Sequence, residues 1–294
     1  MKIKHPSLEL GGEWKTLLKP HKYASYINDH TIFKVGGKWR LLGTSAMGDY
    51  RFFKERFFID GKSNGLDKEM KEVGVQLKKF PYGGIKIAPY VYYDKQHKKY
   101  HLYFASAFTI NHFCSDDGEV WWKVPAAVRT WWPVIRDPFV IKIKSKYAMY
   151  LTDFDNKISV YASKDLFKWK KKKVVFRLGN EVPRSFNSSC ESSTVFKSDD
   201  WYFLLITITP SPEGRRYNYT RTMAFCSKNP YEFGTYSEGD DNTATKCGVL
   251  ETHAPEVIKD GKNIYITTCG WRGFPKPVGV DGEGVYIRRL EIHD

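Results

Sequence analysis

The sequence has no apolar run long enough to cross a membrane. A transmembrane helix needs roughly 18 consecutive apolar residues, and the chain contains no such stretch. Its first six residues, Met1 to Pro6, also lack the apolar segment of a secretion signal. We therefore expect no membrane partner and, for the chain as written, a cytoplasmic location. A secreted mature form, whose signal has been removed, is the alternative.

Cysteine is scarce and unpaired in its spacing. The five cysteines are odd in number and include no Cys-x-x-Cys pair. This spacing argues against both a disulfide framework and a zinc site. The sequence therefore predicts free, mostly buried thiols in a reducing compartment and no metal centre.

Long stretches with helical periodicity are also missing, whereas strand-forming residues are abundant. Apolar residues make up 41% of the 294 residues and aromatic residues 16%. Such a composition supplies a large core and favours β structure. A chain of this length forms either two domains or one large all-β unit.

A unit of strand, turn and strand recurs along the chain. In its clearest copy, Arg136-Asp137-Pro138 opens an apolar run that turns back into a second strand near Tyr147. In the first copy Gly36-Gly37 separates two alternating runs, which is a good hairpin signal. The copies open near five residues, namely Asp29, Ala88, Asp137, Glu191 and His253.

Five such units predict an all-β, five-bladed β-propeller of four-stranded antiparallel blades. One blade cannot bury both of its faces, so the blades must pack on one another around a central channel. No linker separates the units, and we expect residues 1–294 to form a single domain. The polar residues 61–79 are expected to be an inserted loop with a short helix.

Acidic residues open three of the five units. The first strand of each propeller blade lines the channel, so Asp29, Asp137 and Glu191 are expected to converge at one mouth. Like-charge repulsion then raises the pKa of at least one carboxyl group. Glycoside hydrolysis needs one protonated carboxylic acid and one carboxylate that acts as base or nucleophile.

These motifs resemble the five-bladed glycosidases of glycoside hydrolase families 43 and 32, which include arabinofuranosidases, xylosidases and fructosidases. The resemblance covers roughly residues 26–292. Two positions depart from it: His30 stands where fructosidases have proline, and Ser192 follows Glu191 where family 32 has cysteine. The motifs that carry the resemblance are Asn28-Asp29, Arg136-Asp137-Pro138, Glu191 and His253-Ala254-Pro255-Glu256-Val257.

The resemblance implies a role for each acidic residue. It makes Asp29 the base or the nucleophile, Glu191 the general acid, and Asp137 the residue that binds sugar hydroxyls and tunes the acid. It implies that His253 contacts substrate or a central cation or water cluster. No cofactor is required by this chemistry, and the sequence alone gives neither the sugar nor the stereochemical outcome.

Four further residues complete the predicted substrate site. Asn28 and Arg136 adjoin the two aspartates, and Trp132 and Trp271 are expected to stack on a sugar ring. Packing between blades is an equal alternative for the tryptophans. An ion pair with an aspartate, or a solvated surface position, is the alternative for Arg136.

The chain has a net charge of +14. Such a charge favours a polyanionic partner, although a lysine-rich solvated surface explains it equally. The prediction is a glycoside hydrolase that acts on an oligo- or polysaccharide, which the charge allows to be anionic, and that binds no nucleic acid. A non-catalytic carbohydrate-binding propeller is the alternative, and a basic nucleic-acid-binding propeller is a weaker one.

Overall fold

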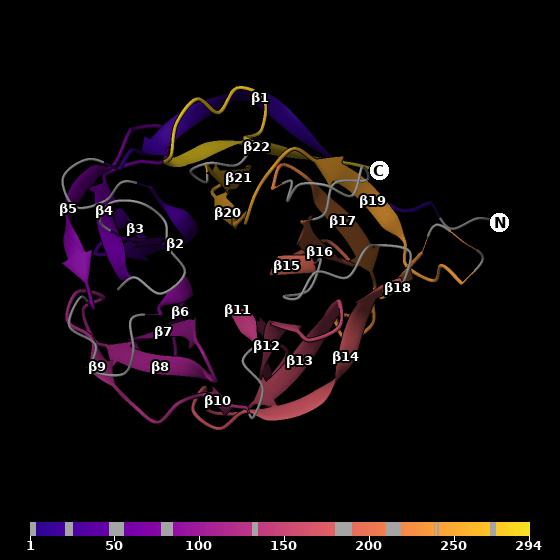
Figure 1. The fold of residues 1–294 in the computed structure, drawn as a ribbon, viewed down its shortest axis with the longest axis horizontal. Helices are drawn as coiled ribbons and strands as arrows, with labels where there is room; N and C mark the ends of the chain where they lie inside the picture. Colours follow the sequence, from indigo (N-terminus) through magenta and orange to yellow (C-terminus); the bar gives the residue numbers. More distant parts are fainter. Residues whose placement is uncertain are drawn as a thin grey trace.

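Five β-sheets surround a central axis in the computed structural model (Figure 1), which describes residues 4–20, 26–46, 56–77, 85–130, 135–179, 190–209, 219–237, 239, 241–270 and 275–294. These residues contain strands, turns and loops, with no helix among them. None of the described segments could therefore cross a membrane as an apolar helix. The expected all-β, five-bladed propeller is confirmed.

Each blade is built on four antiparallel strands, and the sheets of blades 2 and 3 each carry one additional short strand. Blade 1 consists of β2 (Asn28–Val35), β3 (Lys38–Ser45), β4 (Phe57–Ser63) and β5 (Lys71–Gln76). Blade 2 consists of β6 (Ile87–Asp94), β7 (Lys99–Ser106), β8 (Thr109–Ser115) and β10 (Val128–Arg129), and β9 (Trp122–Lys123) also pairs with β8. Blade 3 consists of β11 (Arg136–Ile143), β12 (Lys146–Asp153), β13 (Lys157–Ser163) and β14 (Lys170–Leu178).

The last two blades complete the ring. Blade 4 consists of β15 (Cys190–Ser198), β16 (Trp201–Ile208), β17 (Thr222–Ser227) and β19 (Lys246–Leu250). The short strand β18 (Gly234–Tyr236) leaves this blade and pairs in parallel with β14 of blade 3. Blade 5 consists of β20 (Val257–Asp260), β21 (Asn263–Cys269), β22 (Val285–His293) and β1 (Ser7–Leu18).

Strand β1 closes the ring by joining the two ends of the chain. It pairs antiparallel with β22 from Ser7 opposite His293 to Leu18 opposite Val285. Blade 5 therefore takes its outer strand from the N-terminal end of the chain and the other three from the C-terminal end (Figure 1). This pairing holds the ring closed by hydrogen bonds and packing.

The prediction for residues 61–79 was wrong in its secondary structure. The described part of this stretch holds the end of β4 and all of β5, paired antiparallel in blade 1. Glycine and charged residues hide the strand pattern, because β5 is the outer strand and its residues are exposed or half-buried. An outer strand needs little apolar alternation to pair.

The apolar residues gather in five clusters, one at each contact between neighbouring blades. This arrangement follows from the repeat, because a twisted sheet with two apolar faces can bury both only against its neighbours. Representative pairs across the five contacts are Phe58 and Phe104, Tyr103 and Met149, Tyr150 and Phe225, Phe203 and Ile266, and Leu41 and Val285.

A serine and an acidic or amide residue build the same turn in three blades. In blade 2 the Ser115 hydroxyl donates to Asp117 Oδ1 at 2.9 Å, and the backbone N–H groups of Glu119 and Val120 donate to the same oxygen. Ser163 and Asp165 repeat this pattern in blade 3. The aromatic residues after these turns, which are Trp121, Trp169 and Phe233, pack into the clusters between blades.

Replacing Asp117 by Ala is expected to lower the unfolding free energy by about 1–2 kcal/mol, because the backbone N–H groups that donate to its carboxylate lose their acceptor. Asp116→Ala is the matched control, since its carboxylate is 73% exposed and pairs only with Lys99. That change should stay within about 0.5 kcal/mol. Urea unfolding of both variants measures the difference, and equal effects would contradict a capping role for Asp117.

The lysine run at residues 168–173 lies largely on a free sheet edge. Lys170 to Lys173 are exposed in β14, and β18 pairs with β14 only from Phe176 to Leu178. Charged residues on an open edge discourage pairing with another chain. This position supports a solvated surface, over a binding site for a polyanion, as the explanation of these lysines.

Candidate active site

Four of the five inner strands, β2, β6, β11 and β15, open with a bulge, and the chain adopts the same backbone turn just before the fifth, β20. Five residues at equivalent positions have left-handed backbone conformations: Asp29, Ala88, Asp137, Ser192 and Ala254. Non-glycine residues pay about 1–2 kcal/mol for such a backbone. The same strained conformation in all five blades points to a function that needs the side chains turned towards the axis.

This register corrects the alignment of the repeat. The sequence treated Glu191 and His253 as equivalent to Asp29 and Asp137, but both precede the bulged residue of their own blade. Their equivalents in the other blades are Asn28, Ile87 and Arg136. The third acidic residue of the cluster therefore comes from a different position of the repeat.

A narrow channel of about 40 Å³ lies between these five left-handed residues. Its lining includes Asp29, Asp137 and Ser192 from inner strands and Glu256 from the segment just before β20. A space of this size admits about one or two water molecules and no sugar. The carboxyl groups of Asp29, Asp137 and Glu256 belong to this lining.

Asp137 is held in place from two blades. Its Oδ2 accepts a hydrogen bond from the Thr152 hydroxyl at 2.7 Å and another from the Ser192 backbone N–H at 2.8 Å. Arg136 Nε lies 3.5 Å from the same oxygen. The side chain is 7% exposed, so its orientation is fixed by these contacts.

Glu191 forms an ion pair with Arg136. The Arg136 Nη2 donates to Glu191 Oε2 at 2.9 Å, and the two side chains are 13% and 15% exposed. Burial raises the pKa of Glu191 to about 7, with Arg136 lowering it and Asp137 raising it. Burial outweighs the arginine, so this carboxyl group exchanges its proton near neutral pH.

Asp29 lies in the same electrostatic cluster. Burial raises the pKa of Asp29 well above its usual value, and the charges of Asp137 and Glu191 raise it further. The guanidinium groups of Arg56 and Arg136 oppose this rise. Because the groups interact strongly, the cluster titrates as a unit and its protons belong to the set of carboxyl groups.

The raised pKa of Glu191 makes stability depend on pH. An unfolded glutamate releases its proton near pH 4.5, whereas the folded group keeps it until about pH 7. Stability should therefore fall as pH rises through this window. Relative to Glu191→Gln, the unfolding free energy of the wild type should drop by about 3 kcal/mol between pH 4 and pH 8.

Urea unfolding of both proteins at several pH values measures this effect. The variant cannot titrate at position 191, so the comparison reports the titration of Glu191 together with its coupling to the other groups of the cluster. A difference that stays constant from pH 4 to pH 8 would contradict a raised pKa at Glu191.

Asn28 and His253 occupy the same position of the repeat as Glu191, and both are buried. Asn28 Nδ2 donates to Asp29 Oδ2 at 3.2 Å, and the Cys269 thiol lies 3.8 Å from Asn28 Oδ1. The His253 Nδ1 lies 3.4 Å from that sulfur, and its ring packs on Tyr219. Burial lowers the pKa of His253 to about 4, so the ring is neutral at pH 7.

The backbone matches solved glycosidase structures over nearly its whole length. An arabinanase of Bacillus subtilis matches with a TM-score of 0.65 and 15% identity, over 92% of this chain and 95% of that one. The catalytic domain of a GH62 α-L-arabinofuranosidase from Coprinopsis cinerea matches with a TM-score of 0.66 and 14% identity, over 95% and 96%. An α-L-arabinanase of Cellvibrio cellulosa, solved with arabinohexaose, matches with a TM-score of 0.65 and 12% identity, over 92% and 91%.

The fold is that of these glycosidases. At such low identity the likeness establishes the architecture, and the chemistry has to be argued from this chain's own residues. No protein-family model matches the chain, and no curated protein matches it.

Several residues of the site carry no signal of their own in the sequence. Arg56 acts on Asp29 from just before β4, and Thr152 reaches Asp137 from the neighbouring strand β12. Glu256 lines the channel and accepts the Ile32 N–H at 2.7 Å. Of these, only Glu256 lay inside a recognised motif. The predicted stacking residues Trp132 and Trp271 lie outside the described residues.

The polar atoms that could hold a cation or water belong to the channel wall. His30 Nε2 lies 2.7 Å from the Thr267 hydroxyl, while its Nδ1 has no hydrogen-bond partner in the described part of the chain. Glu256 lies on the same wall, and burial raises its pKa to about 8. Among the described residues, the only set of three or more possible metal ligands whose ligand atoms lie within 4.8 Å of one another is a different cluster, in blade 2. Asp29, Asp137 and Glu191 therefore do not form a compact set of metal ligands.

Proposed function

We propose that this protein is a glycoside hydrolase that releases a terminal furanose or pentose sugar from an oligo- or polysaccharide. One observation carries the proposal. Three acidic residues and two arginines form one buried electrostatic cluster at the channel mouth, in which burial holds the pKa of Glu191 at about 7. A carboxylic acid that is protonated near neutral pH beside a second carboxyl group is the pair that glycoside hydrolysis requires.

In this proposal Glu191 donates its proton to the glycosidic oxygen as the bond to the anomeric carbon breaks. Asp29, once it has lost its own proton, either takes a proton from the attacking water or attacks the anomeric carbon itself. The two routes invert or retain the anomeric configuration, respectively. The configuration of the first product, followed by NMR, distinguishes them.

The other members of the cluster position these two groups. Asp137 raises the pKa of Glu191 by its charge and is aimed by Thr152 and Ser192. Arg136 orients Glu191 and stabilises the carboxylate that forms once Glu191 has given its proton to the glycosidic oxygen. Asn28 donates a hydrogen bond to Asp29 and so helps to orient it.

The choice of sugar rests on the neighbours in fold. They include arabinanases and arabinofuranosidases, one solved with arabinohexaose and another with cellotriose. These names support an arabinose-containing glycan as the first substrate to test. The net charge of +14 adds anionic polysaccharides to the candidates. The chemistry itself needs no cofactor, and a cation or water cluster held by His30 and Glu256 would have a supporting role.

A substrate panel tests the proposal directly. It should contain nitrophenyl α-L-arabinofuranoside, xyloside and galactofuranoside, together with arabinan, arabinoxylan and fructan, and use the Asp29→Asn/Glu191→Gln double variant as the control. We expect sugar release by the wild type from at least one member and none by the control. Equal release by both proteins would refute the assignment. Binding of a glycan without turnover would favour the carbohydrate-binding alternative.

A further inference from the structure

Three metal-ligating side chains meet on one face of blade 2, and none of them lines the central channel. His101 lies in β7, and His112 and Cys114 lie in β8. The strand register places His101 directly opposite Cys114. His112 precedes Cys114 by two residues and therefore shares its face of the sheet.

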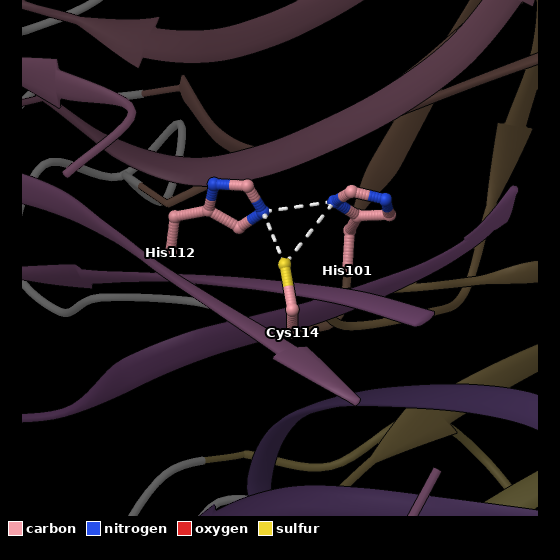
Figure 2. A group of neighbouring side chains, drawn as sticks. All are labelled: His101, His112 and Cys114. Atoms are coloured by element: carbon pink, nitrogen blue, oxygen red, sulfur yellow. Dashed lines mark hydrogen bonds between the residues drawn. The ribbon is translucent and has the colours of Figure 1, made fainter. Parts of the chain in front are cut away.

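The ligand atoms of the three side chains point at one another (Figure 2). The distance from His101 Nδ1 to His112 Nε2 is 2.9 Å. The Cys114 sulfur lies 3.7 Å from the first nitrogen and 3.6 Å from the second. The residues are only 2%, 0% and 1% exposed, so the cluster is enclosed by protein.

These distances leave a place for one metal ion. The point equidistant from the three ligand atoms lies about 2.0 Å from each of them, close to the bond lengths of zinc to imidazole nitrogen (about 2.0–2.1 Å) and to thiolate (about 2.3 Å). An ion at these distances sits near the plane of the three atoms. A small outward movement of the sulfur makes the fit complete.

Aromatic rings cover the cluster and keep it dry. The Tyr103 ring stacks on His112 with centroids 4.5 Å apart. Phe167, from the serine–aspartate turn of blade 3, lies 5.4 Å from the His101 ring and 5.2 Å from the His112 ring. Phe167 is 41% exposed, so its ring separates the two imidazoles from solvent.

We propose that His101 Nδ1, His112 Nε2 and Cys114 Sγ bind one thiophilic d¹⁰ ion, Zn²⁺ or Cu⁺. One thiolate with two imidazoles is a donor set that these ions prefer over Mg²⁺ or Ca²⁺. The Cys114 thiol loses its proton to solvent as the metal–sulfur bond forms. The site links β7 to β8 and is independent of the proposed glycosidase chemistry.

Cobalt substitution gives the first test, because Co²⁺ replaces Zn²⁺ and absorbs light. Protein freed of metal by a chelator and kept reduced without oxygen is titrated with Co²⁺. We expect a thiolate-to-cobalt absorption band in the near ultraviolet that saturates at one equivalent. Excess Zn²⁺ should abolish the band.

Two cysteine variants identify the ligands. Cys114→Ser should lose the band and lower the affinity for Zn²⁺ at least about 100-fold. Cys226→Ser is the matched control, because Cys226 is equally buried but lies beside Cys247 in blade 4; it should keep the band. Circular dichroism checks that both variants fold, and His112→Gln provides a second ligand variant if Cys114→Ser does not.

Competition against a zinc dye and a Cu⁺ chelator then ranks the two ions. We expect the site to be occupied by the ion for which the protein has the higher affinity. Mass spectrometry of the purified protein should find this ion at one equivalent. A Co²⁺ titration without a thiolate band, together with no retention of Cu⁺ against its chelator, would overturn the proposal and leave a hydrogen-bonded His–His–Cys cluster. A band that survives both Cys114→Ser and His112→Gln would overturn it equally.

Discussion

Replacing Glu191 by Gln is expected to lower kcat/KM by about 10³–10⁴-fold on substrates with poor leaving groups, because the glycosidic oxygen then leaves as an anion. Gln has nearly the shape of Glu but no proton to donate. A dinitrophenyl glycoside needs little protonation, so the loss on that substrate should be at least about 100-fold smaller. Steady-state rates on arabinan and on two aryl glycosides measure this contrast.

Glu232→Gln is the control for this experiment, since that side chain is 67% exposed and its ion-pair partner is Lys173 on β14. It should retain the wild-type rates. If Glu191→Gln lost activity equally on all leaving groups, Glu191 would not be the general acid, and its role would be to position Arg136 or the substrate.

Replacing Asp29 by Asn is expected to lower kcat/KM by at least about 10³-fold whatever the leaving group. The step that it serves is the attack on the anomeric carbon, and this step is needed for every substrate. Asn keeps the size of the side chain and can still contact Asn28. The contrast with Glu191→Gln therefore separates the two roles on a single set of substrates.

Asp116→Asn makes the same chemical change on the surface and should leave the rates unaltered. Circular dichroism and urea unfolding should show that Asp29→Asn is folded. We also expect it to be at least as stable as the wild type at pH 8, because burial and two neighbouring carboxylates act against a charge at this position. Full activity in this variant would contradict the proposed mechanism.

The charged cluster at the channel mouth lowers the unfolding free energy of the protein. The five left-handed residues, the buried carboxyl groups and the two arginines are each unfavourable without their partners. The cores between the blades offset these costs, since each of the five contacts buries its own group of large apolar side chains. The rigid ring then holds acidic groups together that would otherwise repel one another.

The sequence by itself determined the architecture. The repeated hairpins, the Gly-Gly turn and the serine–aspartate turns are local patterns, and local hydrogen bonds enforce them wherever they occur. Five copies of a unit with two apolar faces have to pack on one another, so the ring follows from the repeat. The acidic residues Asp29, Asp137 and Glu191 stood out because each lies at the start of a strand hairpin, although Glu191 stands one position earlier in its unit than the aspartates do.

Only the tertiary structure decided the remaining features, because each depends on residues far apart in the chain. The left-handed residues at the channel mouth show which positions of the five blades are equivalent. Glu191 and His253 stand one position before the residues that correspond to Asp29 and Asp137. Arg56 reaches the cluster only once blade 1 has folded. The cysteine spacing predicted no zinc site, yet strand pairing in blade 2 places His101 opposite Cys114, because register brings side chains together that sequence spacing keeps apart.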